Sequence, residues 1–278
     1  MKSVLLIAEG EKMVEGAFRF LDEWCLDEKI KIRCLIPDAI EYEKHLEIEN
    51  FMTLSGVKER LQVHDTDKLV AEQSRIEKKV KQLAASHNYE CTTYFWNTNI
   101  EEIISYATYS DLVLLSNSYH VENIDSLEEQ RNFDRLTHEI TTPMVIIPDH
   151  YQKVENLIFS YSGSPSDAIA IKGFIQLFGK AVENKKVQLL HAGASFSLEY
   201  EYNKSLLLTY LTGKFIDIEV EESTKQTSNV LDDLGREYDN PLVVMGAMGR
   251  SKLSMFFRPS TAKKIIHNGT IPVFISHS

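Results

Sequence analysis

The fold of this chain is indicated by an apolar stretch that occurs twice, as VLLIAEG at residues 4–10 and as LIFSYSG at residues 157–163. In both copies a run of apolar residues leads into a turn that contains glycine. Such a run is typical of a strand that is buried on both faces of a parallel sheet. The constant spacing of 153 residues therefore suggests that the chain contains one structural unit twice.

Four further apolar runs recur in the same order. The pairs are residues 31–36 with 186–191, 91–96 with 215–220, 112–115 with 242–245, and 143–147 with 272–276, at offsets of 155, 124, 130 and 129. We therefore expect two copies of a five-stranded unit, with domains at residues 1–150 and 151–278. The junction near Asp149–Val154 follows the fifth run of the first copy.

The fall in offset from 155 to 124 predicts 31 extra residues in the first unit, near residues 38–68. This segment contains eight acidic and four basic residues. It could serve as a lid or a partner-binding arm, or it could be a surface insertion. We expect a surface insertion, because the entropy cost of closing a loop rises slowly with its length.

Amphipathic patterns lie between the apolar runs, at residues 13–28, 69–87, 169–182 and 230–238. Apolar strands that alternate with amphipathic helices predict βαβ units, in which helices cover both faces of a parallel sheet. The predicted fold class is thus α/β, with an open five-stranded parallel sheet in each half.

Composition excludes several classes of protein. The 278 residues carry a net charge of −11, which argues against general affinity for nucleic acid because phosphate binding needs a basic surface. No apolar run reaches the ~18 residues that a membrane helix requires. The three cysteines, Cys25, Cys34 and Cys91, are scattered, so we expect no disulfide framework and a cytoplasmic location.

The motif with most chemical content follows the fourth run of the second half, as GAMGRS at residues 246–251. After Arg258, Pro259-Ser260-Thr261 opens a predicted helix. Glycines allow a backbone to approach a phosphate, and a helix N-terminus offers free N–H groups. In parallel sheets, ligands bind at this end of the strands.

Here the sequence resembles the universal stress protein family, whose nucleotide-binding members carry G-x-x-G, nine residues, and then G-[S/T]. Gly246, Gly249 and Ser260 keep this spacing, but Pro259 replaces the third glycine. The resemblance implies two tandem Rossmann-like domains of the adenine nucleotide alpha hydrolase type, packed as a pseudo-dimer. It also implies pairing of the edge strands at residues 144–147 and 273–276, and a role in stress response without catalysis.

The resemblance implies a weakened nucleotide site. ATP-binding members usually hold adenine with an aspartate at the end of the first strand, where this chain has Ser162 in the second half and Glu9 in the first. Pro259 also removes a backbone N–H that a phosphate would use, although Arg250 could partly compensate. In the first half, Ser116 and Tyr119 stand where the glycines should be, so the phosphate cradle is absent there.

At most one ligand pocket is therefore expected, in the second half. Its candidate residues are Ser162, Gly163, Gly246, Gly249, Arg250, Ser260 and Thr261. For Gly246 and Gly249 a structural turn is an equal alternative, and for Ser162-Gly163 we favour a strand-to-helix turn capped by Ser164 and Asp167.

No nucleophile–base pair and no spacing of metal ligands is visible, so we expect no enzyme and no metal. His191 ends a predicted strand on the expected ligand side, and we expect it to be a satisfied structural residue. Two hypotheses follow. The chain is a degenerate family member that acts by protein interaction, or it is an ATP-binding regulator, with slow hydrolysis left open. The sequence also leaves a homodimer open.

Overall fold

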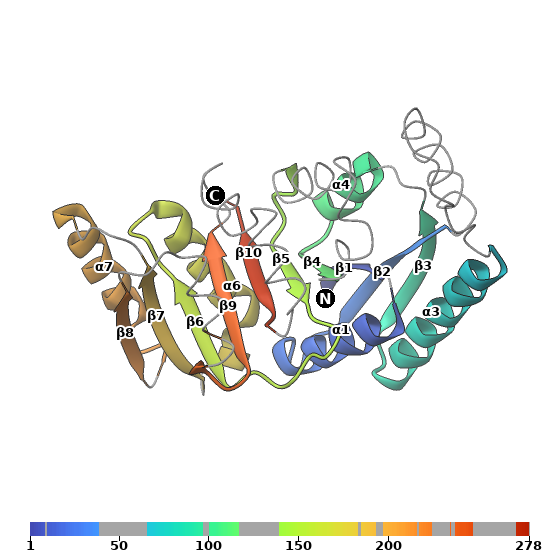
Figure 1. Ribbon diagram of the computed structural model, residues 1–278, viewed down its shortest axis with the longest axis horizontal. Coiled ribbons are helices and arrows are strands. Elements are labelled where there is room, and N and C mark those ends of the chain that lie inside the picture. The colour runs from blue at the N-terminus through green and yellow to red at the C-terminus, as the bar shows by residue number, and fades with distance from the viewer. Residues whose placement is uncertain are drawn as a thin grey trace, which may run out of the picture.

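The computed structural model describes residues 1–8, 10–38, 66–96, 100–116, 139–182, 185–192, 197–215, 217–223, 234, 237–246 and 271–277. Within these residues, ten strands form one continuous sheet in the order β3-β2-β1-β4-β5-β10-β9-β6-β7-β8 (Figure 1). The order is symmetric about its centre, because each half of the sheet runs 3-2-1-4-5 from its outer edge inward when its strands are numbered along the chain.

The first half alternates strands and helices as its apolar pattern predicts. Its elements are β1 (Lys2–Ile7), α1 (Glu11–Trp24), β2 (Ile30–Pro37), α3 (Thr66–Ser86), β3 (Glu90–Trp96), α4 (Ile100–Thr108), β4 (Leu112–Ser116) and β5 (Met144–Ile147). The second half repeats this arrangement. Its elements are β6 (Asn156–Ser160), α6 (Pro165–Val182), β7 (Lys186–Ala192), α7 (Leu198–Leu211), β8 (Ile218–Ser223), β9 (Pro241–Gly246) and β10 (Val273–Ser276).

All neighbouring strands are parallel except at the centre, where β5 and β10 pair antiparallel through three residues each. Val145 lies opposite Phe274 in this pair. Both strands are short and fully buried, which suits an apolar junction between the two halves. The α/β fold class and the mostly parallel sheet are thus confirmed.

The strand register confirms four of the predicted offsets and corrects one. Ile32 pairs with Cys91 in the first half, and the equivalent Val187 pairs with Ile218 in the second. Cys91 therefore corresponds to Ile218, at an offset of 127 rather than 124. The predicted run began too early because Phe215 extends the apolar pattern in the sequence. In the structure Phe215 lies in the turn after α7 and packs against Phe159.

Helices cover both faces of the sheet. One face carries α1, α3, α6 and α7 on an apolar core that runs through both halves of the chain. Its central part is aromatic, since Trp24 of α1 contacts Phe174 and Phe178 of α6 at ring-centroid distances of 5.2 and 5.7 Å. The other face carries α4 and a second core with Leu234. On each face of the sheet, one apolar core therefore contains residues of both halves.

The amphipathic patterns correctly located α1, α3 and α6. The sequence analysis missed α4 and α7. Most of the helix predicted at residues 230–238 lies outside the described residues, as does nearly all of the predicted insertion at residues 38–68.

Candidate functional site

The candidate site begins at the turn between β6 and α6, where Ser162 follows the strand. The Ser162 backbone N–H and hydroxyl both donate to Oδ2 of Asp167, at 2.8 and 2.5 Å. Asp167 stands in the first turn of α6 and is buried. Ser164 caps the same helix by accepting from the Asp167 N–H at 3.3 Å. The polar groups of Ser162 are thus engaged within the turn, as the capped-turn interpretation predicts.

Gly163, the next residue, is explained by backbone conformation and by packing. Its φ of +85° lies in the region that favours glycine, and an added Cβ would lie 3.0 Å from the Tyr200 ring. Asn203 of α7 donates to the Gly163 carbonyl at 3.0 Å. The first turns of α7 therefore pack directly on this loop.

His191 lies at the end of β7 beside the same aromatic side chain. It is 5% exposed, its Nδ1 lies 3.0 Å from the Tyr161 carbonyl oxygen, and its ring centroid lies 4.2 Å from that of Tyr200. Burial raises the pKa of Tyr200 to about 12, so this phenol is neutral at physiological pH. These contacts describe a packed histidine, and they support the expected satisfied histidine at Nδ1.

Gly246 ends β9 and faces the N-terminus of α6. An added Cβ would lie 2.7 Å from the Ser166 hydroxyl and 2.9 Å from the Asp167 nitrogen. This contact is too close for any side chain, so helix packing alone requires glycine at position 246. Within the described part of the chain, the buried Ser166 hydroxyl next to it has no hydrogen-bond partner.

The structure thus brings Ser162, Gly163 and Gly246 together around the start of α6. The other four predicted residues, Gly249, Arg250, Ser260 and Thr261, lie outside the described residues. Sequence reasoning gave Asp167 only a capping role and missed Tyr200. The short spacing from Ser162 to Asp167 could have indicated the first contact, but the approach of α7 is a long-range contact without a sequence signal.

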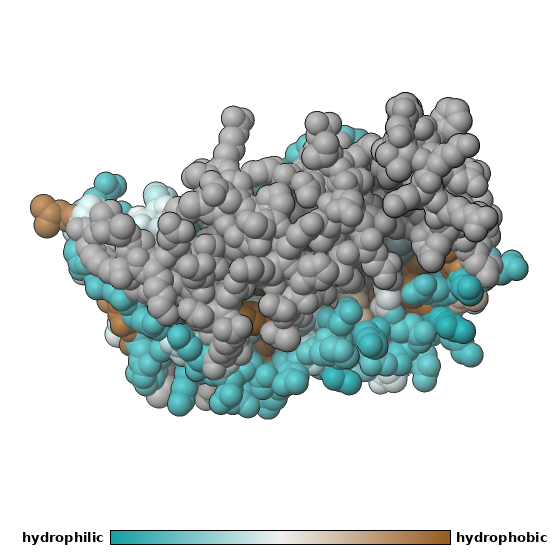
Figure 2. Space-filling model, viewed as in Figure 1, coloured by the Kyte–Doolittle hydropathy of each residue, from teal (hydrophilic) through white to brown (hydrophobic). Residues whose placement is uncertain are grey.

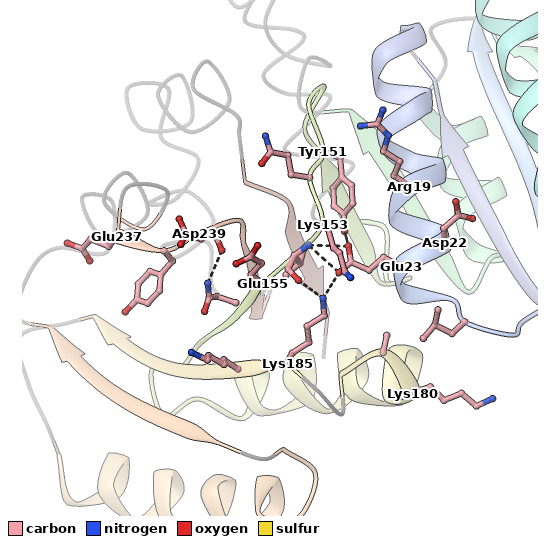
Figure 3. Close-up of a pocket in the computed structure, with 17 residues that line it drawn as sticks. Arg19, Asp22, Glu23, Tyr151, Lys153, Glu155, Lys180, Lys185, Glu237 and Asp239 are labelled. Carbon is pink, nitrogen blue, oxygen red and sulfur yellow. Dashed lines mark hydrogen bonds and ion pairs between the residues drawn. The ribbon is translucent and has the colours of Figure 1, made fainter.

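A groove of about 1260 Å³ lies at the junction of the two halves and was not predicted (Figure 3). It is lined by α1, by the connecting segment at residues 151–156, and by the starts of β6 and β7. At its base, Lys185 forms an ion pair with Glu23. Its cationic and acidic side chains balance in number, and it lies at the amino ends of the strands, away from the ends where such sheets bind ligands.

The described residues contain no group of three or more His, Cys, Asp or Glu side chains that could hold a metal ion. None of the helices among them is long and apolar enough to cross a membrane.

Comparison with known proteins gives one family and several similar folds. Residues 177–277 match the model of the universal stress protein family. A search of curated proteins found no match. The solved structures that resemble the chain include a universal stress protein from Archaeoglobus fulgidus, with 13% identity and a TM-score of 0.60, covering 99% of this chain and 96% of that one.

Two others have similar values. A protein described as a universal stress protein from Pseudomonas aeruginosa has 10% identity and a TM-score of 0.55, covering 100% and 93% of the two chains. The cytoplasmic domain of a prokaryotic cation chloride cotransporter has 9% identity and a TM-score of 0.51, covering 99% and 95%. At these identities the likeness concerns the fold. Residues 177–277 are therefore similar to the universal stress protein family, and the chain as a whole has the fold of the universal stress proteins that it resembles.

Proposed function

We propose that this chain is a non-catalytic universal stress-type protein that acts through protein interactions, with at most one small-ligand pocket in its second half. The observation that carries the proposal is the contact between Ser162 and Asp167. The resemblance implies an aspartate that holds adenine at this position. This chain has Ser162 there, and its N–H and hydroxyl donate to the carboxylate of Asp167 in the same chain.

Packing around the same turn supports the proposal. Tyr200 lies on Gly163, and the Gly246 backbone lies on the first turn of α6. Two of the glycines that suggested a ligand are thus accounted for by packing contacts and backbone conformation. The buried carboxylate of Asp167 also disfavours a phosphate near the N-terminus of α6, because like charges repel.

A variant that restores the family pattern tests this account. We would combine Pro259→Gly with Ser162→Asp and Asp167→Ser, which moves the carboxylate to the end of the strand without placing two acids side by side. Since a ligand raises stability only by binding the folded state, the readout is the melting temperature with ATP and Mg²⁺. We expect no shift for the natural chain and an upward shift for the variant. A shift in the natural chain would contradict the proposal.

A second candidate is an ATP-binding regulator that uses the second-half pocket and hydrolyses ATP slowly. The observation in its favour is the buried Ser166 hydroxyl beside Gly246, which lacks a partner among the described residues and could donate to a ligand. For this candidate, ATP should raise the melting temperature of the natural chain, and Gly249→Trp should abolish the rise.

A further inference from the structure

The ten-stranded sheet ends in β3 on one side and β8 on the other, and the two edges differ in charge. The two edge strands are equivalent in the repeat. Thr92 and Tyr94 of β3 pair with β2 at the positions where Glu219 and Glu221 of β8 pair with β7. An open edge strand presents unpaired backbone groups that can pair with another chain, and charged side chains are a common protection against such pairing. Only one of the two edges has this protection.

On β8, acidic residues occupy positions 219, 221 and 222. Antiparallel pairing of β8 with a second β8 would place Glu219 opposite Glu221 or Glu222 in the central registers. Like charges directly opposite each other destabilise a strand pair. The β8 edge therefore disfavours self-association.

The β3 edge has the opposite character. Its sequence, ECTTYFW, has high β-propensity and a single charged residue, Glu90, whose carboxylate pairs with Lys31 at 2.7 Å. Tyr94 and Phe95 are 36% and 48% exposed, on opposite faces of the strand. Among the described residues, β3 has only β2 as a neighbour in the sheet.

We propose that the β3 edge binds a second copy of this chain, with the two β3 strands antiparallel and centred on Thr93. In this register Thr92 faces Tyr94 of the other copy, and Cys91 faces Phe95. Glu90 faces Trp96, so no two acids meet. The chain already joins its own halves by the same kind of contact, in the antiparallel pair of β5 and β10. The proposal is independent of whether the second half binds a nucleotide.

The interface is small, because seven residues a side bury less than the ~1,600 Å² of a standard interface. The dimer should therefore form reversibly, and sedimentation velocity should show a shift from monomer to dimer as protein concentration rises. A monomer at every concentration would overturn the proposal. It would favour an extended segment of another protein as the partner of the β3 edge.

The test of the interface transfers the β8 pattern to β3. Thr92→Glu with Tyr94→Glu places acids opposite acids across the dimer axis and should abolish the dimer while the circular dichroism spectrum stays unchanged. The matched control is Leu198→Glu with Leu206→Glu, which adds the same charge to exposed apolar positions of α7. The control should still dimerise. Loss of the dimer in the control, or its survival in the β3 variant, would overturn the assignment.

Cross-linking tests the register itself. At the dimer axis the two Thr93 residues face each other, and directly opposed residues in antiparallel strands are close enough for a disulfide. Thr93→Cys in a Cys91→Ser background should therefore give a covalent dimer on oxidation. A reversible dimer that Thr93→Cys does not cross-link would contradict the register centred on this residue.

Discussion

Glu23 and Lys185 form a partly buried ion pair that ties the first half of the chain to the second (Figure 3). Their side chains are 10% and 13% exposed. Glu23 also accepts from the Val154 N–H at 3.1 Å and from the Tyr151 hydroxyl at 2.8 Å, and this hydroxyl accepts from Trp24 Nε1 at 2.9 Å. One carboxylate therefore holds the connecting segment, α1 and the start of β7 together.

Lys185→Met should destabilise the protein by about 1.5–3 kcal/mol, because the partly buried Glu23 carboxylate loses its cation and a charge-assisted hydrogen bond. The measurement is urea unfolding. Lys180→Met is the matched control, since Lys180 is 72% exposed and lies 3.8 Å from the exposed Asp27, and it should change stability by less than about 1 kcal/mol. Equal effects of the two substitutions would show that the Glu23 pair does not join the halves.

Gly246→Ala should cost about 1–3 kcal/mol, because the new methyl group would collide with the first turn of α6. Gly179→Ala provides the control within α6, where an added Cβ meets nothing within 4 Å and helix propensity should raise stability by about 0.5–1 kcal/mol. Thermal unfolding measures both. A neutral Gly246→Ala would mean that packing does not explain this glycine.

Asp167→Ala should destabilise the chain by about 1–3 kcal/mol, because the Ser162 N–H and hydroxyl would lose their acceptor inside a partly buried turn. Ser162→Ala removes only the hydroxyl bond and should cost less. Chemical denaturation compares the two variants. If Ser162→Ala were the more damaging, the carboxylate would not be the centre of the turn.

The cysteines should react slowly in the folded protein. Burial raises the pKa of Cys25 and of Cys91 to about 11, and it raises the pKa of the more deeply buried Cys34 as well. Because the thiolate is the reactive form, thiol labelling at pH 8 should be slow and should accelerate as pH rises toward 11. All three should label at once in denaturant. Rapid labelling of the folded chain at pH 8 would contradict these shifts.

The fold was largely predictable because most of the inner strands leave buried apolar runs, and their order repeats. Helix α7 was missed because apolar residues lie on two of its faces. Tyr200, Leu207 and Leu211 are buried, whereas Leu198 and Leu206 are exposed, so no single stripe marks it. Figure 2 shows exposed apolar atoms at the end of the molecule where Figure 1 places α7.

The candidate site was predictable only in part. A local motif indicated Gly246, but the reason for glycine there is the approach of α6, which begins some eighty residues earlier in the chain. Likewise, the position of Ser162 after a strand identified it as a candidate. Its hydrogen bond to Asp167 depends on the geometry of the first turn of α6. Such contacts are set by packing between elements and leave no periodic pattern.

Isothermal titration of the purified chain with ATP and Mg²⁺ tests the central claim most directly. The claim is that the second-half pocket has lost tight nucleotide binding because its strand-end contact is made within the protein, by Ser162 and Asp167. We predict no heat beyond dilution up to millimolar ATP. Micromolar binding that Gly249→Trp abolishes would contradict the claim.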